Sequence, residues 1–243
     1  MSGDGYDGYD RLRIDRTGQA EAFDAIGDRY DEAFPHKEGQ LISGRTLAEQ
    51  LPAGSRVLDV GCGTGLPTAA QLTEAGHRVV GIDLSPAMVK LARDNVPAAE
   101  FHVADLADLS GPTDLADLAD PAVPADGEAQ GPPGPGLFDG IAAYFSLLML
   151  PRAEIPYALR TLHGLLRPEG LLALSMVEAD VDDFAIPFLG RTIRVSGYVR
   201  DELRQVVLDA GFEVAGEDSY SYAPASTDVP PEIQLFLNCR RRA

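Results

Sequence analysis

Apolar residues in the middle of the chain form short runs that alternate with longer, helix-like patterns. Val57–Val60 is a run of mostly apolar, β-favouring residues, followed by glycines at alternate positions and then by a helical pattern. Val79–Asp83, Phe101–Ala104 and Leu137–Tyr144 are later runs of the same kind. Strands that alternate with helices favour a mainly parallel sheet covered by helices. The pattern therefore predicts an α/β fold.

Three segments lie outside this alternation. Residues 1–18 are polar, glycine-rich and without periodicity, which predicts a disordered N-terminal tail ahead of one domain at 19–243. Residues 19–51 contain two helical patterns separated by a break near Pro35. In the segment 111–136, eleven of the 26 residues are Gly or Pro, so a disordered insertion is predicted between the third and fourth strands.

The turn after the first strand has glycine at positions 61, 63 and 65, where the backbone must bend sharply and lie against a ligand. A dinucleotide-binding motif would need its third glycine at the next position, where Leu66 stands. A P-loop would need a lysine, and there is no Lys or Arg between Val57 and His77. The pattern therefore disfavours a polyphosphate ligand. Asp59, just before the turn, favours a ligand with a cationic part.

A further acid stands at the next strand end. Asp83 closes its strand at a position from which a carboxylate can accept hydrogen bonds from a ribose. Taken together, VLDVGCGTG, VVGIDLS and FHVADL resemble the S-adenosylmethionine site of class I S-adenosylmethionine-dependent methyltransferases of the small-molecule type. The resemblance covers about residues 20 to 240. It implies a Rossmann-like seven-stranded sheet with helices on both faces, an antiparallel last strand and a helical N-terminal lid at 19–51.

The resemblance also implies which residues bind S-adenosylmethionine. Asp105 would meet the adenine amino group, and Leu106 would donate its backbone N–H to the ring. Met88 would pack on the adenine and Tyr30 would lie near the methionine part, although both also fit ordinary core packing. The complete predicted set is Tyr30, Asp59, Gly61, Cys62, Gly63, Gly65, Asp83, Leu84, Met88, Asp105, Leu106 and Tyr144.

The residues around the methyl acceptor are harder to identify. Many relatives have a histidine where this chain has Met149, so we do not expect a histidine base at that position. The candidates for catalysis are Tyr144 at the end of the fourth strand, Glu178 at the end of the fifth, and His36 in the lid turn. An amine or acid acceptor needs little help from a base, whereas a phenol or carbon acceptor usually needs one.

The resemblance implies that the lid and a cap segment at 178–198 together form the substrate pocket. This segment is rich in bulky apolar residues, among them Phe184 and Phe188, which we expect to contact the acceptor. The pocket therefore favours a mainly hydrophobic small molecule with an O, N or C acceptor atom, such as a specialised metabolite. Two alternatives remain open: a peptide or protein methyltransferase, and a protein that binds S-adenosylmethionine without methyl transfer, as a cyclase or a regulator.

The composition of the chain disfavours some classes of binding partner. The net charge of −18 and the pI near 4.4 disfavour a nucleic-acid partner, because phosphates are bound by Lys and Arg. No apolar run is long enough to span a membrane, and the two cysteines give no disulfide framework. No cluster has metal-ligand spacing, so no metal is predicted. We expect a cytoplasmic protein and leave its oligomeric state open.

Overall fold

The computed structural model describes residues 16–109, 138–223 and 231–242. The predicted insertion at 111–136 lies outside these ranges, and so does most of the predicted tail. The tail boundary at residue 18 is wrong, because helix α1 already begins at Thr17 and Arg16 is buried.

The central sheet has seven strands in the order β3-β2-β1-β4-β5-β9-β8. Neighbouring strands are parallel from β3 to β5, and β9 runs antiparallel to both β5 and β8. This arrangement confirms the predicted fold class. The strands are β1 (Arg56–Val60), β2 (Arg78–Asp83), β3 (Glu100–Val103), β4 (Phe138–Tyr144), β5 (Leu166–Val177), β8 (Phe212–Tyr222) and β9 (Glu232–Arg241).

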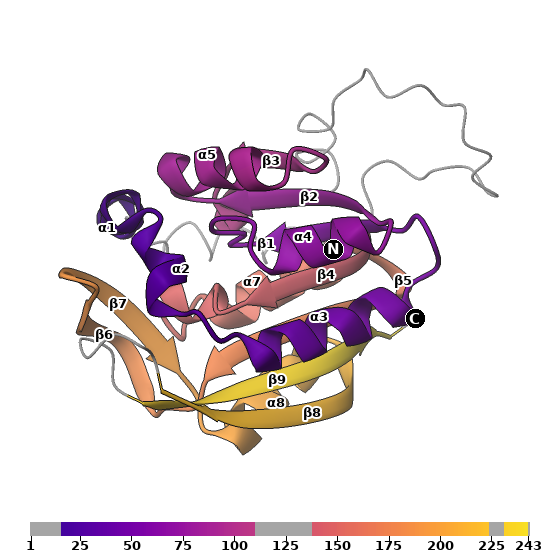
Figure 1. Ribbon diagram of the computed structural model, residues 1–243. Coiled ribbons are helices and arrows are strands. Elements are labelled where there is room, and N and C mark those ends of the chain that lie inside the picture. Colours follow the sequence, from indigo (N-terminus) through magenta and orange to yellow (C-terminus); the bar gives the residue numbers. More distant parts are fainter. Residues whose placement is uncertain (1–15, 110–137, 224–230, 243) are drawn as a thin grey trace.

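Helices cover both faces of the sheet (Figure 1). The alternation of side chains along each strand supplies both cores: Val57 packs with α3, α4 and α5 on one face, and Leu58 packs with α7 and α8 on the other. The helices are α3 (Glu38–Gln50), α4 (Thr68–Glu74), α5 (Pro86–Asn95), α7 (Ile155–Leu165) and α8 (Arg200–Asp209), with short 3-10 helices η1 (Leu106–Asp108) and η2 (Leu147–Met149).

A smaller layer lies at one end of the sheet, where α1 (Thr17–Ile26) and α2 (Arg29–Ala33) lie near a hairpin of β6 (Val181–Phe188) and β7 (Arg191–Gly197) (Figure 1). The predicted cap segment is thus a two-stranded antiparallel hairpin. Its core is separate from those of the main sheet and joins residues of α1, α2, α5 and the hairpin. The buried members are Ala22, Ile26, Ala33, Met88, Phe188, Leu189 and Ile193.

The expected lid at 19–51 is too long, because its second helix, α3, belongs to the main body. Leu47 and Leu51 pack into the sheet core, and α3 contacts α4, β5 and β9. Gly39 permits this approach: a Cβ there would come within 2.6 Å of the Phe236 ring and 2.7 Å of the Tyr220 ring. The lid therefore consists of α1 and α2 with the hairpin beside them.

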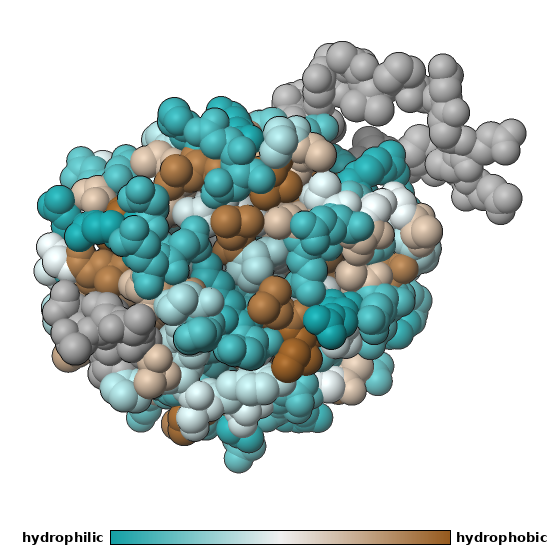
Figure 2. All heavy atoms as spheres, viewed as in Figure 1, coloured by the Kyte–Doolittle hydropathy of each residue, from teal (hydrophilic) through white to brown (hydrophobic). Residues whose placement is uncertain are grey.

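The surface is mainly polar on the face that carries α3 and α4, and hydrophobic residues there form separate small groups (Figure 2). Within the described residues, none of the helices combines the length and the apolar character needed to cross a bilayer.

Candidate functional site

The glycine turn follows β1 and has the conformation that its sequence predicts. Gly61, Gly63 and Gly65 all have positive φ, at 68°, 53° and 78°. A Cβ on Gly61 would lie 2.5 Å from the Cβ of Ser146, so Gly61 lets the turn approach the end of β4. A Cβ on Gly63 would meet nothing within 4 Å. The turn is therefore packed against protein at Gly61 and borders open space at Gly63, where a ligand can lie against the backbone.

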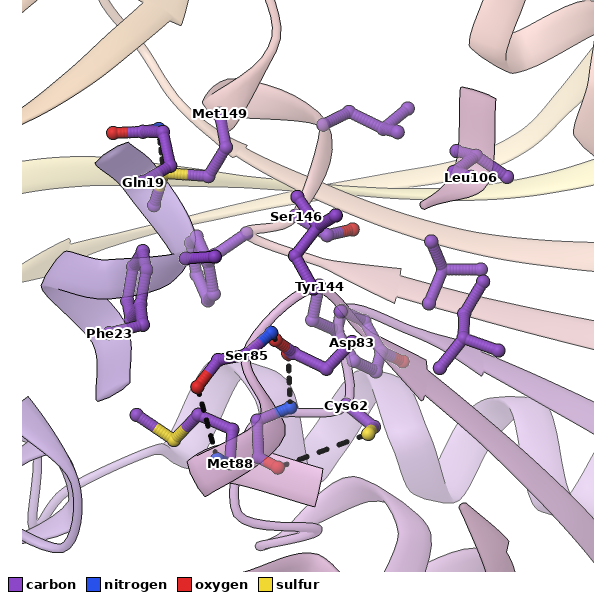
Figure 3. Close-up of a pocket in the computed structure, with 18 of the residues that line it drawn as sticks. Gln19, Phe23, Cys62, Asp83, Ser85, Met88, Leu106, Tyr144, Ser146 and Met149 are labelled. Carbon is purple, nitrogen blue, oxygen red and sulfur yellow. Dashed lines mark hydrogen bonds between the residues drawn. The ribbon is translucent and has the colours of Figure 1, made fainter. Parts of the chain in front are cut away.

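Asp83, at the end of β2, ties this turn to the start of α5. Its two carboxylate oxygens accept hydrogen bonds from the backbone N–H groups of Gly63 and Ser85, each at 2.9 Å (Figure 3). Burial raises the pKa of the Asp83 carboxyl, and these two hydrogen bonds partly oppose that effect. Each oxygen keeps the capacity for a further hydrogen bond, which suits a ribose diol.

Asp59 is the most isolated charged group near the turn. It is 2% exposed, and its Oδ2 is buried without a hydrogen-bond partner in the described part of the chain. Burial and the nearby charge of Asp83 raise the pKa of Asp59 to about 7. A buried carboxylate without a partner is costly unless a cation lies near it. Asp59 and the open side of Gly63 therefore both fit a ligand that bears a positive charge.

Asp105, which follows β3, binds a residue that the sequence did not indicate. The guanidinium of Arg16 donates to Asp105 Oδ2 at 2.5 Å and to Glu154 Oε2 at 2.5 Å. The side chain of Arg16 is 4% exposed and that of Glu154 is fully buried, so the ion pairs lie inside the protein. Asp105 also accepts a hydrogen bond from the N–H of Ala107 at 2.8 Å. An adenine amino group at Asp105 would therefore share this carboxylate with Arg16.

Polar side chains hold the lid over the turn. Ser85 Oγ donates to Asp24 of α1 at 2.5 Å, and Thr64 Oγ1 donates to Asp31 of α2 at 2.6 Å. Lys37 Nζ donates to the other oxygen of Asp31 at 2.5 Å. These polar contacts act together with the apolar core that α1 and α2 share with α5 and the hairpin.

Under the lid lies a cleft of about 150 Å³, bordered by the glycine turn, the ends of β2 and β4, and α1. Ligand sites usually have volumes of about 300 to 1,000 Å³. Gln19 of α1 donates to the Met149 sulfur at 3.4 Å, and both residues line the cleft (Figure 3).

Ten of the twelve predicted cofactor residues line this cleft. The two exceptions are Asp59, whose carboxyl is buried beneath the turn, and Gly65. A Cβ on Gly65 would lie 3.2 Å from Val96 and 3.4 Å from Ala92, so this glycine serves the packing of α5. The ten that line it are Tyr30, Gly61, Cys62, Gly63, Asp83, Leu84, Met88, Asp105, Leu106 and Tyr144.

A second, larger cavity of about 670 Å³ lies between the lid, the hairpin and the ends of β5, β8 and β9. Its walls are mainly aromatic and aliphatic, with Phe34, Phe188 and Ile193 among them. It meets the cleft at five residues that line both: Tyr30, Lys37, Gln40, Phe145 and Met149. Lys37 and Gln40 are the members of this shared boundary that the sequence did not indicate.

The three predicted catalytic residues do not converge. Tyr144 lines only the cleft, and its hydroxyl donates to Ser43 Oγ at 2.9 Å. Burial raises the pKa of that hydroxyl. Glu178 lines the larger cavity, but its carboxylate accepts from the N–H of Arg200 at 3.2 Å. The side chain of His36 is 76% exposed. We find no pair among them arranged for proton transfer.

Phe184 does not contact either cavity, which corrects our expectation for it. The residue is 58% exposed, whereas Phe188 is 7% exposed and lines the larger cavity. Phe188 packs against Phe23, Tyr30 and Phe34, with ring centroids 5.8 to 6.4 Å apart.

Known proteins resemble this chain in sequence and in fold. A family model described as a methyltransferase domain matches residues 36–216. The magnesium-protoporphyrin O-methyltransferase of Rhodobacter capsulatus is 39% identical over 80 residues, which cover 30% of this chain and 35% of that protein. The ubiquinone biosynthesis O-methyltransferase of Xanthomonas axonopodis pv. citri is 32% identical over 182 residues, covering 71% and 66%. The chain thus spans about one third to two thirds of the length of these relatives.

Among solved structures, the 1,6-didemethyltoxoflavin-N1-methyltransferase of Burkholderia thailandensis superposes with a TM-score of 0.62 at 21% identity. The match covers 100% of this chain and 93% of that protein, which was crystallised with 1,6-didemethyltoxoflavin and S-adenosylhomocysteine. This likeness supports the fold that the strand order shows.

Proposed function

Because the chain belongs to the methyltransferase-domain family, we propose that it transfers a methyl group from S-adenosylmethionine to a hydrophobic small molecule by in-line displacement. Membership of this family confirms the resemblance, the enzyme class and the cofactor that the sequence predicted. The nature of the acceptor and the role of each residue belong to the proposal.

The main support for this proposal is that the cleft and the larger cavity adjoin each other. One has the glycine turn and the strand-end acids, and the other has an apolar wall. They share Tyr30, Lys37, Gln40, Phe145 and Met149. An in-line displacement needs the nucleophile and the departing group on opposite sides of the transferred carbon, within a space from which water is excluded. The five shared residues therefore border the place where the methyl group would pass.

Each part of the first cleft has a role in this scheme. Gly63 leaves its backbone open to the cofactor, and Asp83 would accept hydrogen bonds from the ribose hydroxyls. Asp105 would receive the adenine amino group beside Arg16, and Asp59 would face the positive charge. S-adenosylmethionine supplies a methyl group on a sulfonium, which is already an activated electrophile. The chain then has mainly to hold, orient and dehydrate the reactants.

The second cavity favours a small molecule over a peptide. Residues of α2 border it on one side and the hairpin on another, and its volume of about 670 Å³, partly open to solvent, matches a small molecule. Because Arg200 already binds the Glu178 carboxylate, Glu178 would form part of the wall of this cavity and would not act as a base. His36, whose side chain is largely exposed, would contact an acceptor only at the rim of the larger cavity.

Methyl-labelled S-adenosylmethionine and fractionated cell extract test the proposal. We expect a labelled small molecule to form together with S-adenosylhomocysteine, and we expect the enzyme with Gly61→Val to form neither. Binding of the cofactor without any labelled product across all fractions would contradict methyl transfer and favour a protein that uses the cofactor in another way. A labelled polypeptide would instead contradict the small-molecule acceptor.

A further inference from the structure

The larger cavity has a polar end that the proposed reaction does not use. Glu232 begins β9 and pairs directly with Tyr222, the last residue of β8. Gln234 lies two residues further along β9, on the same side of the strand, and its amide donates to Glu232 Oε1 at 2.8 Å. All three residues line the larger cavity, and none of them lines the cleft.

A row of aromatic rings connects this polar end with the lid. Tyr222 stacks on Phe34 with ring centroids 5.9 Å apart and planes 14° apart. Phe34 in turn stacks on Phe188 at 5.8 Å and 25°, and on Tyr30 at 5.1 Å and 29°. All four rings also line the larger cavity, and a lining of aromatic side chains suits an aromatic ligand that can pack against their free faces and edges.

Glu232 has no counter-charge within the described residues. The nearby cation Lys37 is bound to Asp31, and Arg200 is bound to Glu178 and Glu217. Burial raises the pKa of the Glu232 carboxyl, and the hydrogen bond from Gln234 opposes this. A partly buried carboxylate against aromatic walls is stabilised when a cation or a strong hydrogen-bond donor reaches it.

Building on the proposed function, we propose that the acceptor is a planar aromatic molecule with a protonated amine, and that Glu232 binds this amine and so determines specificity. Gln234 orients the carboxylate through its hydrogen bond. Because Glu232 lies outside the cleft, the amine anchors the end of the acceptor away from the transferred methyl group. The atom that accepts the methyl group then lies at the other end of the molecule, near Phe145 and Met149.

Three matched probes test the charge preference without knowledge of the natural acceptor: naphthylmethylamine, naphthylmethanol and naphthoate. Calorimetry near neutral pH measures their affinity for the full chain saturated with S-adenosylhomocysteine. We expect the amine to bind at least about tenfold more tightly than the alcohol, because a hydrogen bond between charged groups exceeds a neutral one. We expect naphthoate to bind most weakly of the three.

Glu232→Gln keeps the shape and removes the charge. We expect this variant to bind the amine about tenfold more weakly while its affinity for the alcohol stays within about twofold. Glu169→Gln is the matched control, because the Glu169 side chain is 60% exposed and lies outside both cavities, and it should keep the preference of the wild type. If Glu232 had only a structural role, Glu232→Gln would bind all three probes more weakly by a similar factor.

The proposal is overturned if the wild type binds amine and alcohol equally, if the preference survives in Glu232→Gln, or if S-adenosylhomocysteine binds normally and no probe binds. A titration of S-adenosylhomocysteine alone separates these results from failure of the proposed function. Loss of that binding in the wild type would count against the methyltransferase assignment itself, whatever the probes show.

Discussion

The two cavities are built in different ways. The cleft gets its glycine turn and two of its acids, Asp83 and Asp105, from residues 61–105, where three neighbouring parallel strands end side by side. The larger cavity combines segments that are far apart in the chain, at 30–40, 145–149, 177–196, 221–223 and 231–234. In the cleft, positions are set largely by the backbone, through glycine conformation and N–H groups. In the larger cavity they are set by the packing of side chains from separate elements.

This difference bears on what each region tolerates. A backbone that must adopt positive φ and approach a neighbour closely allows almost no other residue. A wall of packed apolar side chains accepts other side chains of similar volume at modest cost. We therefore expect substitutions in the two cavities to have different effects. Changes in the cleft should weaken binding of the cofactor, and changes in the apolar wall should weaken binding of the acceptor alone.

The largest effect is expected for Gly61→Val. The side chain would clash with Ser146 and strain a φ of 68°, so we expect cofactor affinity to fall by more than about hundredfold. Gly54→Val is the matched control, since Gly54 has a φ of 74° but no atom within 4 Å of its Cβ position. Calorimetry should show normal cofactor binding for the control. Equal losses in both variants would mean that backbone strain, and not the clash in the cleft, is responsible.

Asp83→Ala removes a side chain that binds both the turn and the proposed ribose. We expect affinity for S-adenosylmethionine to fall by about ten- to thirtyfold, or roughly 1 to 2 kcal/mol. The exposed Asp94 at the end of α5 provides the control variant, Asp94→Ala, which should bind normally. Unchanged affinity in Asp83→Ala would remove Asp83 from the cofactor site.

On the acceptor side, Phe188→Ala and Phe184→Ala form a matched pair on one hairpin. Phe188 is buried in the cavity wall and Phe184 is exposed outside it. We expect Phe188→Ala to lower the affinity for naphthylmethylamine by about tenfold, because apolar contact is lost. Cofactor affinity should stay within about threefold of the wild type. Phe184→Ala should bind both ligands normally. A loss of cofactor affinity in Phe188→Ala would show that the two cavities cannot be perturbed separately, because Phe188 also shares a core with Met88.

The sequence predicted the sheet and most of the cofactor cleft, because both depend on local patterns. The glycines, Asp83 and the strand ends are adjacent in the chain and form their contacts through the backbone. Arg16 could not be found in this way: its partners Asp105 and Glu154 are 89 and 138 residues distant, and polar residues without periodicity surround it. Glu232, Lys37 and Gln40 were missed for the same reason. Phe184 and Phe188 are both bulky apolar residues with the same parity on one strand, and only the packing of Phe188 against rings of α1 and α2 distinguishes them.

The smallest effect that we expect concerns Asp59 and pH. Its pKa of about 7 lies above the unfolded value of 3.8 because of burial and the charge of Asp83. Below pH 7 the carboxyl is mostly protonated in the ligand-free protein, so a cationic cofactor must displace a proton to gain a charged partner. Affinity for S-adenosylmethionine should therefore fall by about fivefold from pH 8 to pH 6. In Asp59→Asn the affinity at pH 8 should be lower, and this part of the pH dependence should be absent.

Stability should change in the opposite direction. Between about pH 4 and pH 7 the folded protein retains a proton on Asp59 that the unfolded chain has lost. The free energy of unfolding contributed by this group therefore decreases as pH rises through that window. Without ligand, Asp59→Asn should melt at a higher temperature than the wild type at pH 8, with a smaller difference at pH 5. Thermal melts with and without cofactor check both signs. A variant that is less stable at pH 8 and binds the cofactor normally would show that Asp59 serves the fold and not the cofactor.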